Sequence, residues 1–573
     1  MLRADDIPLT ASQSVADTRI LHQDAVTGIA DFEIDHARVH DMDRPQRRKR
    51  RRFGGIILLA PALLAFTGCT VGPDFQRPKA TVSQSWLETE DHRVSTGSAT
   101  YRSWWSAFED PVLNRLIERA YRENLSLRQA GVRVLQARAQ LGIAVGEVFP
   151  QTQQGVGAVQ YNRISDRAVT SVASNGGIAY WQSQIGLQTS WELDFWGKIR
   201  RGIESADANL LSTLADYDNT LVTLTADVAN AYIALRTAEE RIRIARENVE
   251  TQEESLEIAE ARFKYGTATQ LDVEQARTSL FNTQASIPTL ETQVRQGRDA
   301  LSVLLGMPPG ELSDLLARPQ GIPVSPPQVV VGIPADLLRR RPDIRSTELQ
   351  AAAQSAQIGV AKADLFPAFT LVGNLVLLST DLGKFKLSDM FSWGSRSIQV
   401  GPTVQWNIFN YGQITNNVRV QDARFQQLLL AYQNAVLSAQ QDVEDNLIAF
   451  LRAQDRAHLL AQSVDSARTA VGLAVLQYRE GVTDFTTVLT AQQTLLGQQD
   501  NLASTLGTIS TSLVGIYRAL GGGWEIREGQ DLVPPETKAE MQQRTNWGRL
   551  LAPSTYNLPA SREPKVAPRP PDW

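Results

Sequence analysis

The segment AQLGIAVGEVFP at residues 139–150 returns as AQIGVAKADLFP at residues 356–367. Six of the twelve positions are identical, and the two segments lie 217 residues apart. A single match of this length can arise by chance, so it becomes informative only when further positions recur at a nearly constant separation. The match therefore raises the hypothesis that the chain contains two copies of one unit.

Three more landmarks recur, each at a separation of 215 residues. They are Trp191 and Gly197 with Trp406 and Gly412, Phe263 and Gly266 with Tyr478 and Gly481, and Leu305-Gly306 with Leu520-Gly521. A nearly constant separation over four landmarks indicates a tandem duplication. Each copy is far longer than the repeat of a solenoid protein, which has about 20–45 residues. We therefore expect two large copies that form one pseudo-symmetric unit.

Each copy contains an apolar stripe with steps of three and four residues over an unusual length, which predicts long helices at about 198–264 and 413–478. At a rise of 1.5 Å per residue, such a helix is about 100 Å long. Glycine commonly ends helices, so we expect shorter helices to return after Gly266 and Gly481. The stripe is rich in Ala and the other faces are polar, which favours packed helices around a polar space over an exposed coiled coil.

The shorter helical segments fit a simple arrangement. The returning helices are expected at about 271–305 and 486–520, and further helical segments at 109–147 and 336–364. Stacked end to end in pairs, these segments match the length of the two long helices.

Between the short and the long helix of each copy lies a segment without helical periodicity, at about 149–195 and 366–410. Alternating stretches such as residues 180–191 predict strands, two in each copy. Aromatic residues near the strand ends are typical of a bilayer interface. Four strands cannot close a barrel, and an open sheet edge does not occur in lipid, so membrane insertion requires several chains. Three chains would supply twelve strands. The alternative is a small soluble sheet.

The N-terminal region has the order of a bacterial lipoprotein signal peptide. A cluster of basic residues precedes an uncharged apolar run at 53–66, followed by small residues and Cys69. The run is too short for a membrane-spanning helix, which needs about 20 residues. We therefore expect a signal peptide at 42–68 and a lipid-modified Cys69. Met42 is a suitable start, so residues 1–41 are expected to be a non-native extension. The alternative is a buried structural cysteine.

Composition excludes several classes of function. The chain of 573 residues has a net charge of −5, which argues against capture of nucleic acid by the whole chain. One cysteine excludes an intrachain disulfide, and five histidines form no cluster with metal-ligand spacing. Paired carboxylates, a Ser/His/Asp set and a phosphate-binding loop are not evident. We therefore expect no enzyme, no cofactor and no metal.

These residues resemble a known family. The stretches at 69–78 (CTVGPDFQRP) and 338–344 (LRRRPDI), with the glycine-containing turns at Gly266 and Gly481, resemble the TolC family of outer-membrane channels. Within it they are most similar to the NodT-type lipoproteins of resistance-nodulation-division (RND) efflux systems. The resemblance covers about Cys69 to Trp524.

The resemblance implies a mainly α fold with a membrane β-barrel. Three tandem-duplicated chains would form a twelve-helix periplasmic α-barrel and a twelve-stranded outer-membrane β-barrel, with four strands from each chain. The expected partners are two further copies of the chain, a periplasmic adaptor (membrane fusion protein), an inner-membrane RND transporter and outer-membrane lipid, with no nucleic acid. The function implied is a passive duct that exports small molecules, located in the outer membrane, lipid-anchored and extending into the periplasm.

Site residues follow from the same resemblance. Cys69 would carry an S-diacylglycerol and an N-linked palmitoyl chain. The two helix tips would dock the adaptor through Gly266, Thr267, Ala268, Gly481, Val482 and Thr483. Candidates for the aperture of the tunnel are Asp484, Thr487 and Thr490. Asp484 would form a threefold ring of negative charge there, or it is a helix N-cap that accepts backbone N–H bonds.

The expected organisation has an N-terminal periplasmic segment at 69–108 and a first efflux repeat at 109–306. A Pro-rich belt at 307–335, a second repeat at 336–521 and a C-terminal tail at 522–573 follow. Two other functions remain open from sequence: the outer-membrane duct of a type I protein secretion system, which uses the same fold, and a periplasmic scaffold.

Overall fold

The computed structural model describes residues 70–97, 101–165, 179–310, 312, 315–316 and 321–552. The expected extension at 1–41, the signal peptide at 42–68 and Cys69 lie outside this part of the chain, as does the end of the tail from residue 553.

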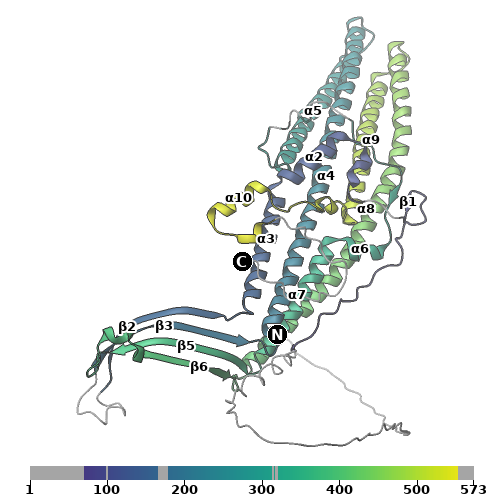
Figure 1. The fold of residues 1–573 in the computed structure, drawn as a ribbon. Coiled ribbons are helices and arrows are strands. Elements are labelled where there is room, and N and C mark those ends of the chain that lie inside the picture. Colours follow the sequence, from purple (N-terminus) through teal and green to yellow (C-terminus); the bar gives the residue numbers. More distant parts are fainter. Residues whose placement is uncertain are drawn as a thin grey trace, which may run out of the picture. The chain divides into compact units, whose positions relative to one another are not determined.

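The two copies contain the same elements in the same order (Figure 1). The first copy comprises α2 (Pro111–Glu123), α3 (Leu125–Gly146), β2 (Thr152–Arg163), β3 (Ala179–Leu193), α4 (Lys198–Lys264) and α5 (Gln270–Leu304). The second comprises α6 (Pro334–Arg340), α7 (Pro342–Ala363), β5 (Ala368–Thr380), β6 (Arg396–Gln405), α8 (Gln413–Arg479) and α9 (Phe485–Ala519). Helix α10 (Pro535–Arg544) and the short strands β1 (Val94–Ser95) and β4 (Val329–Val330) lie outside the copies.

Corresponding helices have equal lengths, which confirms the duplication. Helices α4 and α8 each have 67 residues. Helices α5 and α9 each have 35 residues, and α3 and α7 each have 22. The expected helical segments at 109–147 and 336–364 are both broken, at Asn124 and Arg341, because these two residues have extended backbone. Pro342 at the first turn of α7 reinforces the second break, since the residue before proline avoids helical backbone.

Helix α4 lies between neighbours of the same chain on two flanks. It packs against α3 and α5 on one flank and against α7 and α9 on the other, whereas α8 packs only against the α7 and α9 flank. The order of the helical layer is therefore α3 with α5, then α4, then α7 with α9, then α8.

The short helices stack end to end in both copies. In the first copy, the Asn124 side chain accepts from Leu127 N and donates to the carbonyl oxygen of Leu304 at the end of α5, both at 2.8 Å. In the second copy Arg341 Nη1 donates to the carbonyl oxygen of Ala519 at the end of α9, at 3.0 Å. Each junction thus supplies a side-chain donor to a helix end whose last carbonyls lack partners within the helix.

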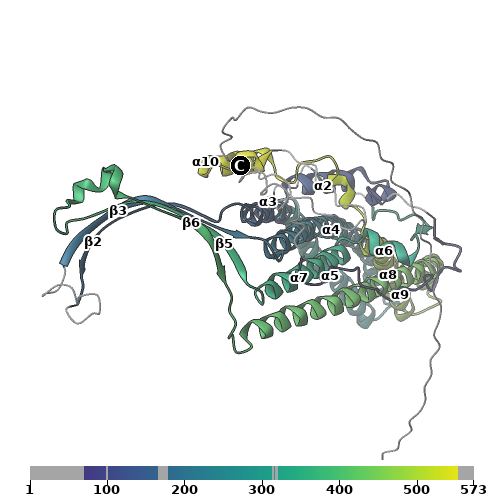
Figure 2. The same cartoon turned by 60° about the horizontal axis from the view of Figure 1, so that its bottom comes forward.

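The four long strands form one antiparallel sheet in the order β2-β3-β5-β6 (Figure 2). The pairs Ile185 with Leu377 and Leu187 with Leu375 fix the register between the two hairpins. Strands β2 and β6 are the sheet edges, and Figure 2 shows the strands curved along their length. These edge strands adjoin α3 and α8, which are the edge elements of the helical layer.

The largest core surrounds α4 in the middle of the helical layer. Trp86, Trp104, Tyr232 and Phe450 are nearly or fully buried there, with Tyr432 and many aliphatic side chains. The C-terminal tail joins this core through the short helix η5 (Trp524–Arg527), because Arg527 forms a two-pronged ion pair with Asp218 of α4. The Nη2 to Oδ2 distance is 2.8 Å, and both side chains are at most 3% exposed.

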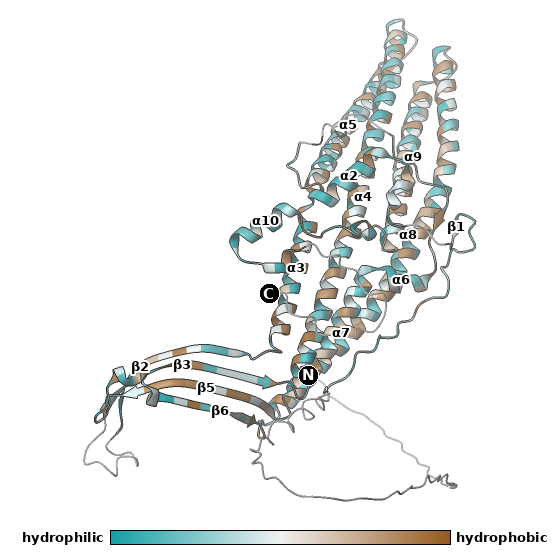
Figure 3. Ribbon diagram, viewed as in Figure 1, coloured by the Kyte–Doolittle hydropathy of each residue, from teal (hydrophilic) through white to brown (hydrophobic). Residues whose placement is uncertain are grey.

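Apolar and polar residues are interspersed along the strands and the long helices (Figure 3). Within the described residues, no helix is both long enough and apolar enough to cross a membrane.

Candidate functional site

One face of the helical layer is covered by segments outside the long helices. The N-terminal segment crosses α8, where the backbone N–H groups of Ser83 and Leu87 donate to Gln440 at 2.9 Å and to Glu444 at 3.0 Å. The Pro-rich belt crosses α9, where Ser510 Oγ donates to the carbonyl oxygen of Pro323 at 2.8 Å. On α4, the Tyr232 hydroxyl donates to Asp110 at 2.8 Å.

The opposite face of the same helices is uncovered and polar. Two residues along a helix correspond to about half a turn, so Asp442, Ser512 and Asn230 point away from these covering contacts. They line a hollow of about 650 Å³. Its polar lining from α4, α8 and α9 is Asn219, Thr223, Asn230, Asp442, Asn446, Thr511, Ser512 and Arg518. The uncovered face is thus suited to contact with water and polar solutes.

This polar face continues along α9 to its start. Thr487, Thr490 and Thr494 precede Thr508, Thr511 and Gly515 by 21 residues each, which is three heptads and keeps them on one seam of a left-handed supercoil. Thr487, Thr490 and Thr494 line a second hollow of about 470 Å³ together with Asp484, beside Ala467 and Ala470 of α8. The structure therefore brings the aperture candidates Thr487 and Thr490 together on the uncovered face.

The third aperture candidate, Asp484, is the N-cap of α9. Its carboxylate accepts from Thr487 N at 3.1 Å and from Thr487 Oγ1 at 3.0 Å, and Thr483 Oγ1 donates to the same Thr487 hydroxyl. A carboxylate at this position satisfies a free N–H of the first helical turn. The N-cap alternative from the sequence is therefore realised in the structure.

The two helix tips have the same backbone design. Gly266 and Gly481 have φ angles of +74° and +77°. In both tips the N–H of the next residue reaches back to a carbonyl of the last helical turn, Thr267 to Arg262 and Val482 to Gln477, each at 2.9 Å. Only glycine adopts this backbone without steric cost, which explains the matching glycines.

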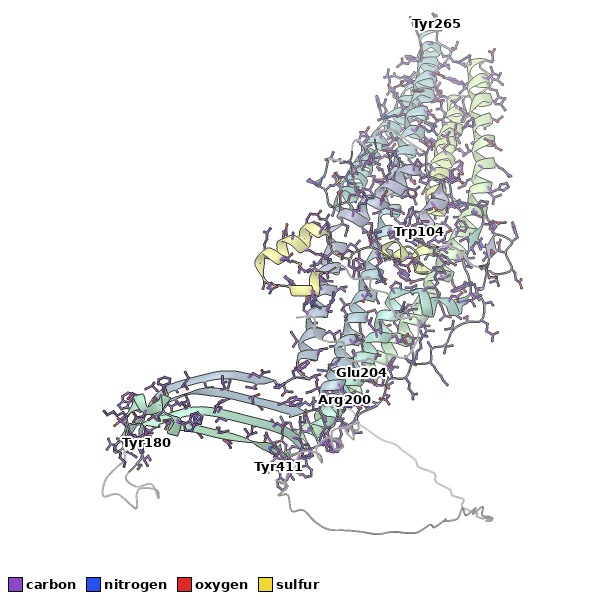
Figure 4. All side chains as sticks on the ribbon, viewed as in Figure 1. Trp104, Tyr180, Arg200, Glu204, Tyr265 and Tyr411 are labelled. Carbon is purple, nitrogen blue, oxygen red and sulfur yellow. The ribbon has the colours of Figure 1, made fainter. Side chains whose placement is uncertain are left out.

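Exposed side chains gather at these tips. The side chain of Val482 is 75% exposed, and Ala268 and Tyr265 lie in the turn between α4 and α5 (Figure 4). All six docking candidates thus lie in the two turns, accessible from outside the helical layer.

A contact that sequence reasoning missed joins the two tips. The Arg262 guanidinium of α4 lies over the ring of Tyr478 of α8, 4.6 Å from its centroid, and Arg262 Nη2 donates to the carbonyl oxygen of Thr267 at 3.2 Å. Burial raises the pKa of Tyr478, so the ring stays neutral. Both residues occupy the last helical turn before a tip glycine. This shared position is the only feature of the sequence that could have pointed to the contact. The contact is a cation–π link between the copies.

The sheet has one apolar and one polar face, because directly paired residues share a face and successive residues alternate. The apolar face carries Val159, Tyr161, Trp181, Ile185, Leu187, Trp191, Leu371, Leu375, Leu377, Ile398, Val400 and Val404. The other face is mostly polar and carries Gln154, Gln160, Asn162, Gln182, Gln184, Gln188, Ser190, Asn374, Gln399, Thr403 and Gln405, with Val156, Val372, Val376 and Leu378 among them. The apolar face is open, since Val400 is 79% exposed.

The apolar face has the height of a membrane. Trp181 and Trp191 lie on this face ten residues apart in β3. At about 3.3 Å per residue and a tilt of about 40°, they are separated by about 25 Å along the membrane normal, which is the height of the apolar band in outer-membrane barrels. The two tryptophans therefore lie where aromatic girdles flank the lipid.

The junction between strands and helices holds a second aromatic cluster. The rings of Trp196 and Phe366 stack at 4.6 Å, and Trp196 Nε1 donates to the carbonyl oxygen of Pro367 at 2.8 Å. Thr70 packs against Gly197 at the start of α4, and Val71 N donates to the carbonyl oxygen of Trp196 at 3.0 Å. The residue that follows Cys69 is therefore beside the inner end of the apolar face.

No group of three or more His, Cys, Asp or Glu side chains in the described ranges could hold a metal ion.

A curved sheet with an open apolar face of membrane height, joined to long helices with an uncovered polar face, defines a membrane-inserted duct protein. The chain belongs to the outer membrane efflux protein family, which it matches over residues 116–307 and 333–522.

Several relatives are similar over most of the chain. The probable efflux pump outer membrane protein SepC of Pseudomonas putida is 33% identical over 484 residues, which cover 82% of this chain and 97% of that protein. Nodulation protein T of Rhizobium leguminosarum bv. trifolii is 29% identical over 464 residues, covering 80% and 96%. The solved structure of the outer-membrane channel OprN superimposes with a TM-score of 0.74 at 34% identity, covering 80% of this chain and 100% of that chain.

These similarities confirm the resemblance to the TolC family and its NodT-type members. They also confirm the fold class, a mainly α duplicated chain whose trimer combines a twelve-helix α-barrel with a twelve-stranded membrane β-barrel. The chain is an efflux channel of the outer membrane, which decides against the secretion and scaffold alternatives. The family is one of passive ducts and is not an enzyme class.

Proposed function

We propose that three copies of this chain form a duct that exports small molecules as the outer-membrane part of a tripartite efflux system. This proposal rests on one observation: the unpaired edges of the sheet and of the helical layer lie on the same two sides of the protomer. Strand β6 and helix α8 are free on one side of the protomer, and β2 and α5 on the other, where the C-terminal tail covers part of α3. Pairing β2 with β6 of the next copy would satisfy backbone groups that lipid cannot satisfy.

A single preparation tests this proposal. The purified full chain is run on a gel unheated and heated, and the same sample is inserted into planar bilayers. We expect a trimer-sized band that heating converts to the monomer, together with stable conductance. A folded monomer without conductance contradicts the proposed duct.

The proposed partners at the inner end are a periplasmic adaptor and, through it, an inner-membrane RND transporter. Both tips present small or apolar side chains, Ala268 and Val482, beside rigid glycine turns, a surface suited to other helical tips. Replacing Ala268 and Val482 by Glu is expected to reduce adaptor capture at least 10-fold while conductance is retained. Unchanged capture would exclude these positions from the contact.

We further propose that translation starts at Met42 and that Cys69 carries the lipid. The position of Thr70 beside the inner aromatic cluster supports the lipidation, because Thr70 directly follows Cys69 and this cluster lies at the expected membrane surface. Mass spectrometry of the mature N-terminal peptide should show a triacylated Cys69, and the Cys69→Ser variant should lack it. An unmodified N-terminus that retains residues 1–41 contradicts both points.

A further inference from the structure

The loop between β5 and β6, residues 381–395, folds over the lipid-facing side of the sheet. Ser183 and Ser379 lie on the apolar face, since they pair directly with each other between Trp181 and Ile185 of β3 and their partners in β5. Both are at most 7% exposed, and their hydroxyls donate to the carbonyl oxygens of Leu387 at 3.3 Å and Lys386 at 2.8 Å. The short helix η3 (Leu387–Phe391) therefore covers the far end of the apolar face.

This loop combines exposed aromatic rings with cations. Phe391 and Trp393 are 74% and 84% exposed. The Arg396 guanidinium lies over the Trp393 ring and donates Nε to the Trp393 carbonyl oxygen at 2.8 Å. Lys384 and Lys386 are also exposed. Rings that sit at headgroup level, next to cations, are typical of a membrane interface.

The carboxylates of the loop are occupied by backbone groups. Asp381 accepts from Trp181 N at 2.6 Å, and Asp389 accepts from Lys386 N at 2.8 Å. No carboxylate in the described part of the chain lies within ion-pair distance of Lys384, Lys386 or Arg396. The loop and Arg396, the first residue of β6, thus present three cations without an ion-pair partner among the described residues, next to the two carboxylates that the backbone holds.

The inner end of the sheet differs. There Lys198 pairs with Asp364 at 2.8 Å, and Arg200 with Asp194 at 3.0 Å. Two cations near the strand–helix junction are therefore paired within the protein, whereas Lys384, Lys386 and Arg396 have no carboxylate partner among the described residues.

We propose that the β5–β6 loop binds the phosphate groups of an anionic glycolipid in the outer leaflet. Lys384, Lys386 and Arg396 would hold the phosphates through charge-assisted hydrogen bonds, while Phe391 and Trp393 lie at the level of the sugar and the first acyl carbons. Three cations exceed what one phosphodiester needs and match a headgroup with two phosphates. The inference rests on the membrane placement in the proposed function.

The test compares lipid binding by three forms of the full-length trimer in detergent. They are the wild type, the triple variant Lys384→Gln, Lys386→Gln and Arg396→Gln, and a control with exposed cations elsewhere, Lys264→Gln, Lys362→Gln and Arg419→Gln. Binding of diphosphorylated lipid A, phosphatidylglycerol and phosphatidylcholine is followed by Trp fluorescence and by lipid phosphate retained after gel filtration. The gel shift and conductance of each form are recorded, so that loss of the duct is distinguished from loss of lipid binding.

We expect lipid A to bind the wild type and the control alike, and the triple variant at least 10-fold more weakly, with conductance unchanged. Equal binding of lipid A by all three forms overturns the proposal. Binding of phosphatidylglycerol as tight as that of lipid A also overturns it, because the site would then recognise any anionic lipid rather than a phosphorylated sugar.

Discussion

Helices α4 and α8 occupy the same place in the two copies and have the same length, but they differ in burial. Helix α4 has 30 buried residues and α8 has 13. Helix α4 has neighbours from its own chain on both flanks, whereas α8 has them on one flank only. The two helices are thus equal in length after the duplication, but they differ in burial because they occupy different positions in the helical layer.

Several leucines of α8 are exposed in the protomer. Leu430, Leu437 and Leu459 are all more than half exposed, as is Leu473 nearer the tip. An apolar stripe of this length on a soluble surface marks an interface. We infer that α4 holds the protomer together while α8 contacts the next protomer.

The largest expected effect is at the buried ion pair of α4. Replacing Asp218 by Ala leaves the Arg527 guanidinium buried without its partner, which we expect to cost about 3–5 kcal/mol of protomer stability. The temperature at which helical circular dichroism is lost should fall markedly. The matched change on α8 is Asp442→Ala, since Asp442 is about half exposed in its pair with Arg341 and should cost less than about 1 kcal/mol. Equal losses for the two variants would contradict the division of tasks.

The second effect sharpens the role of α8. Leu437→Glu places a charge on the proposed interface in each of three chains, and it loses apolar burial worth about 2 kcal/mol per chain. We expect the trimer band of the unheated sample to disappear while helicity of the protomer is kept. The volume-conserving variant Leu437→Met should still form trimers. A stable trimer of the Leu437→Glu variant would place the interface elsewhere.

The third effect concerns the tip contact between α4 and α8. Arg262→Met keeps the packing on Tyr478 but removes the charge, which we expect to weaken the link by about 1 kcal/mol. If this link holds the tips together, the open fraction in single-channel recordings should rise about fivefold. The control Arg277→Met loses a pair with Glu260 inside the first copy and should leave the open fraction unchanged.

We also expect a pH dependence of stability with opposite signs in the two helices. Hydrogen bonding from Arg93 lowers the pKa of Asp455 in α8, so its contribution is present above about pH 4 and is lost as the pH falls further. It should amount to a few tenths of a kcal/mol, because the Asp455 side chain is nearly half exposed and solvent screens its charge. Below pH 4, the unfolding temperature of the Asp455→Asn variant should depend less on pH than that of the wild type.

Burial raises the pKa of Asp218 in α4 to about 6. Its contribution is therefore present below about pH 4 and is lost as the pH rises through 6. The Asp218→Asn variant should lose this dependence of thermal stability on pH. If Asp455→Asn and Asp218→Asn change the pH dependence in the same direction, the opposite signs expected for the two carboxylates are wrong.

The features that depend on local sequence patterns could be predicted from the sequence. Glycines at the tips end the helices through their backbone, and apolar periodicity marks the long helices, so the duplication and the four strands could be read directly. The sequence also left two roles open for Asp484, and the structure places its carboxylate in the N-cap. Its place beside Thr487 and Thr490 at the same hollow leaves the aperture role a prediction.

Contacts between distant residues could not be predicted in this way. Asp218 and Arg527 are 309 positions apart, and Arg262 and Tyr478 lie in different copies. Neither pair has a spacing that a pattern could reveal. The polar face of α9 also needed the structure, because only the segments crossing Ser510 and Gln440 identify which side is covered.

The equal lengths of corresponding helices constrain how such a duct can change in evolution. One heptad added to α4 moves its tip by about 10.5 Å, so α5 must gain the same heptad to remain paired. Helices α8 and α9 must then follow, or Arg262 and Tyr478 lose contact. Insertions should therefore be inherited as sets of four heptads, and the reach of the duct across the periplasm changes in steps rather than continuously.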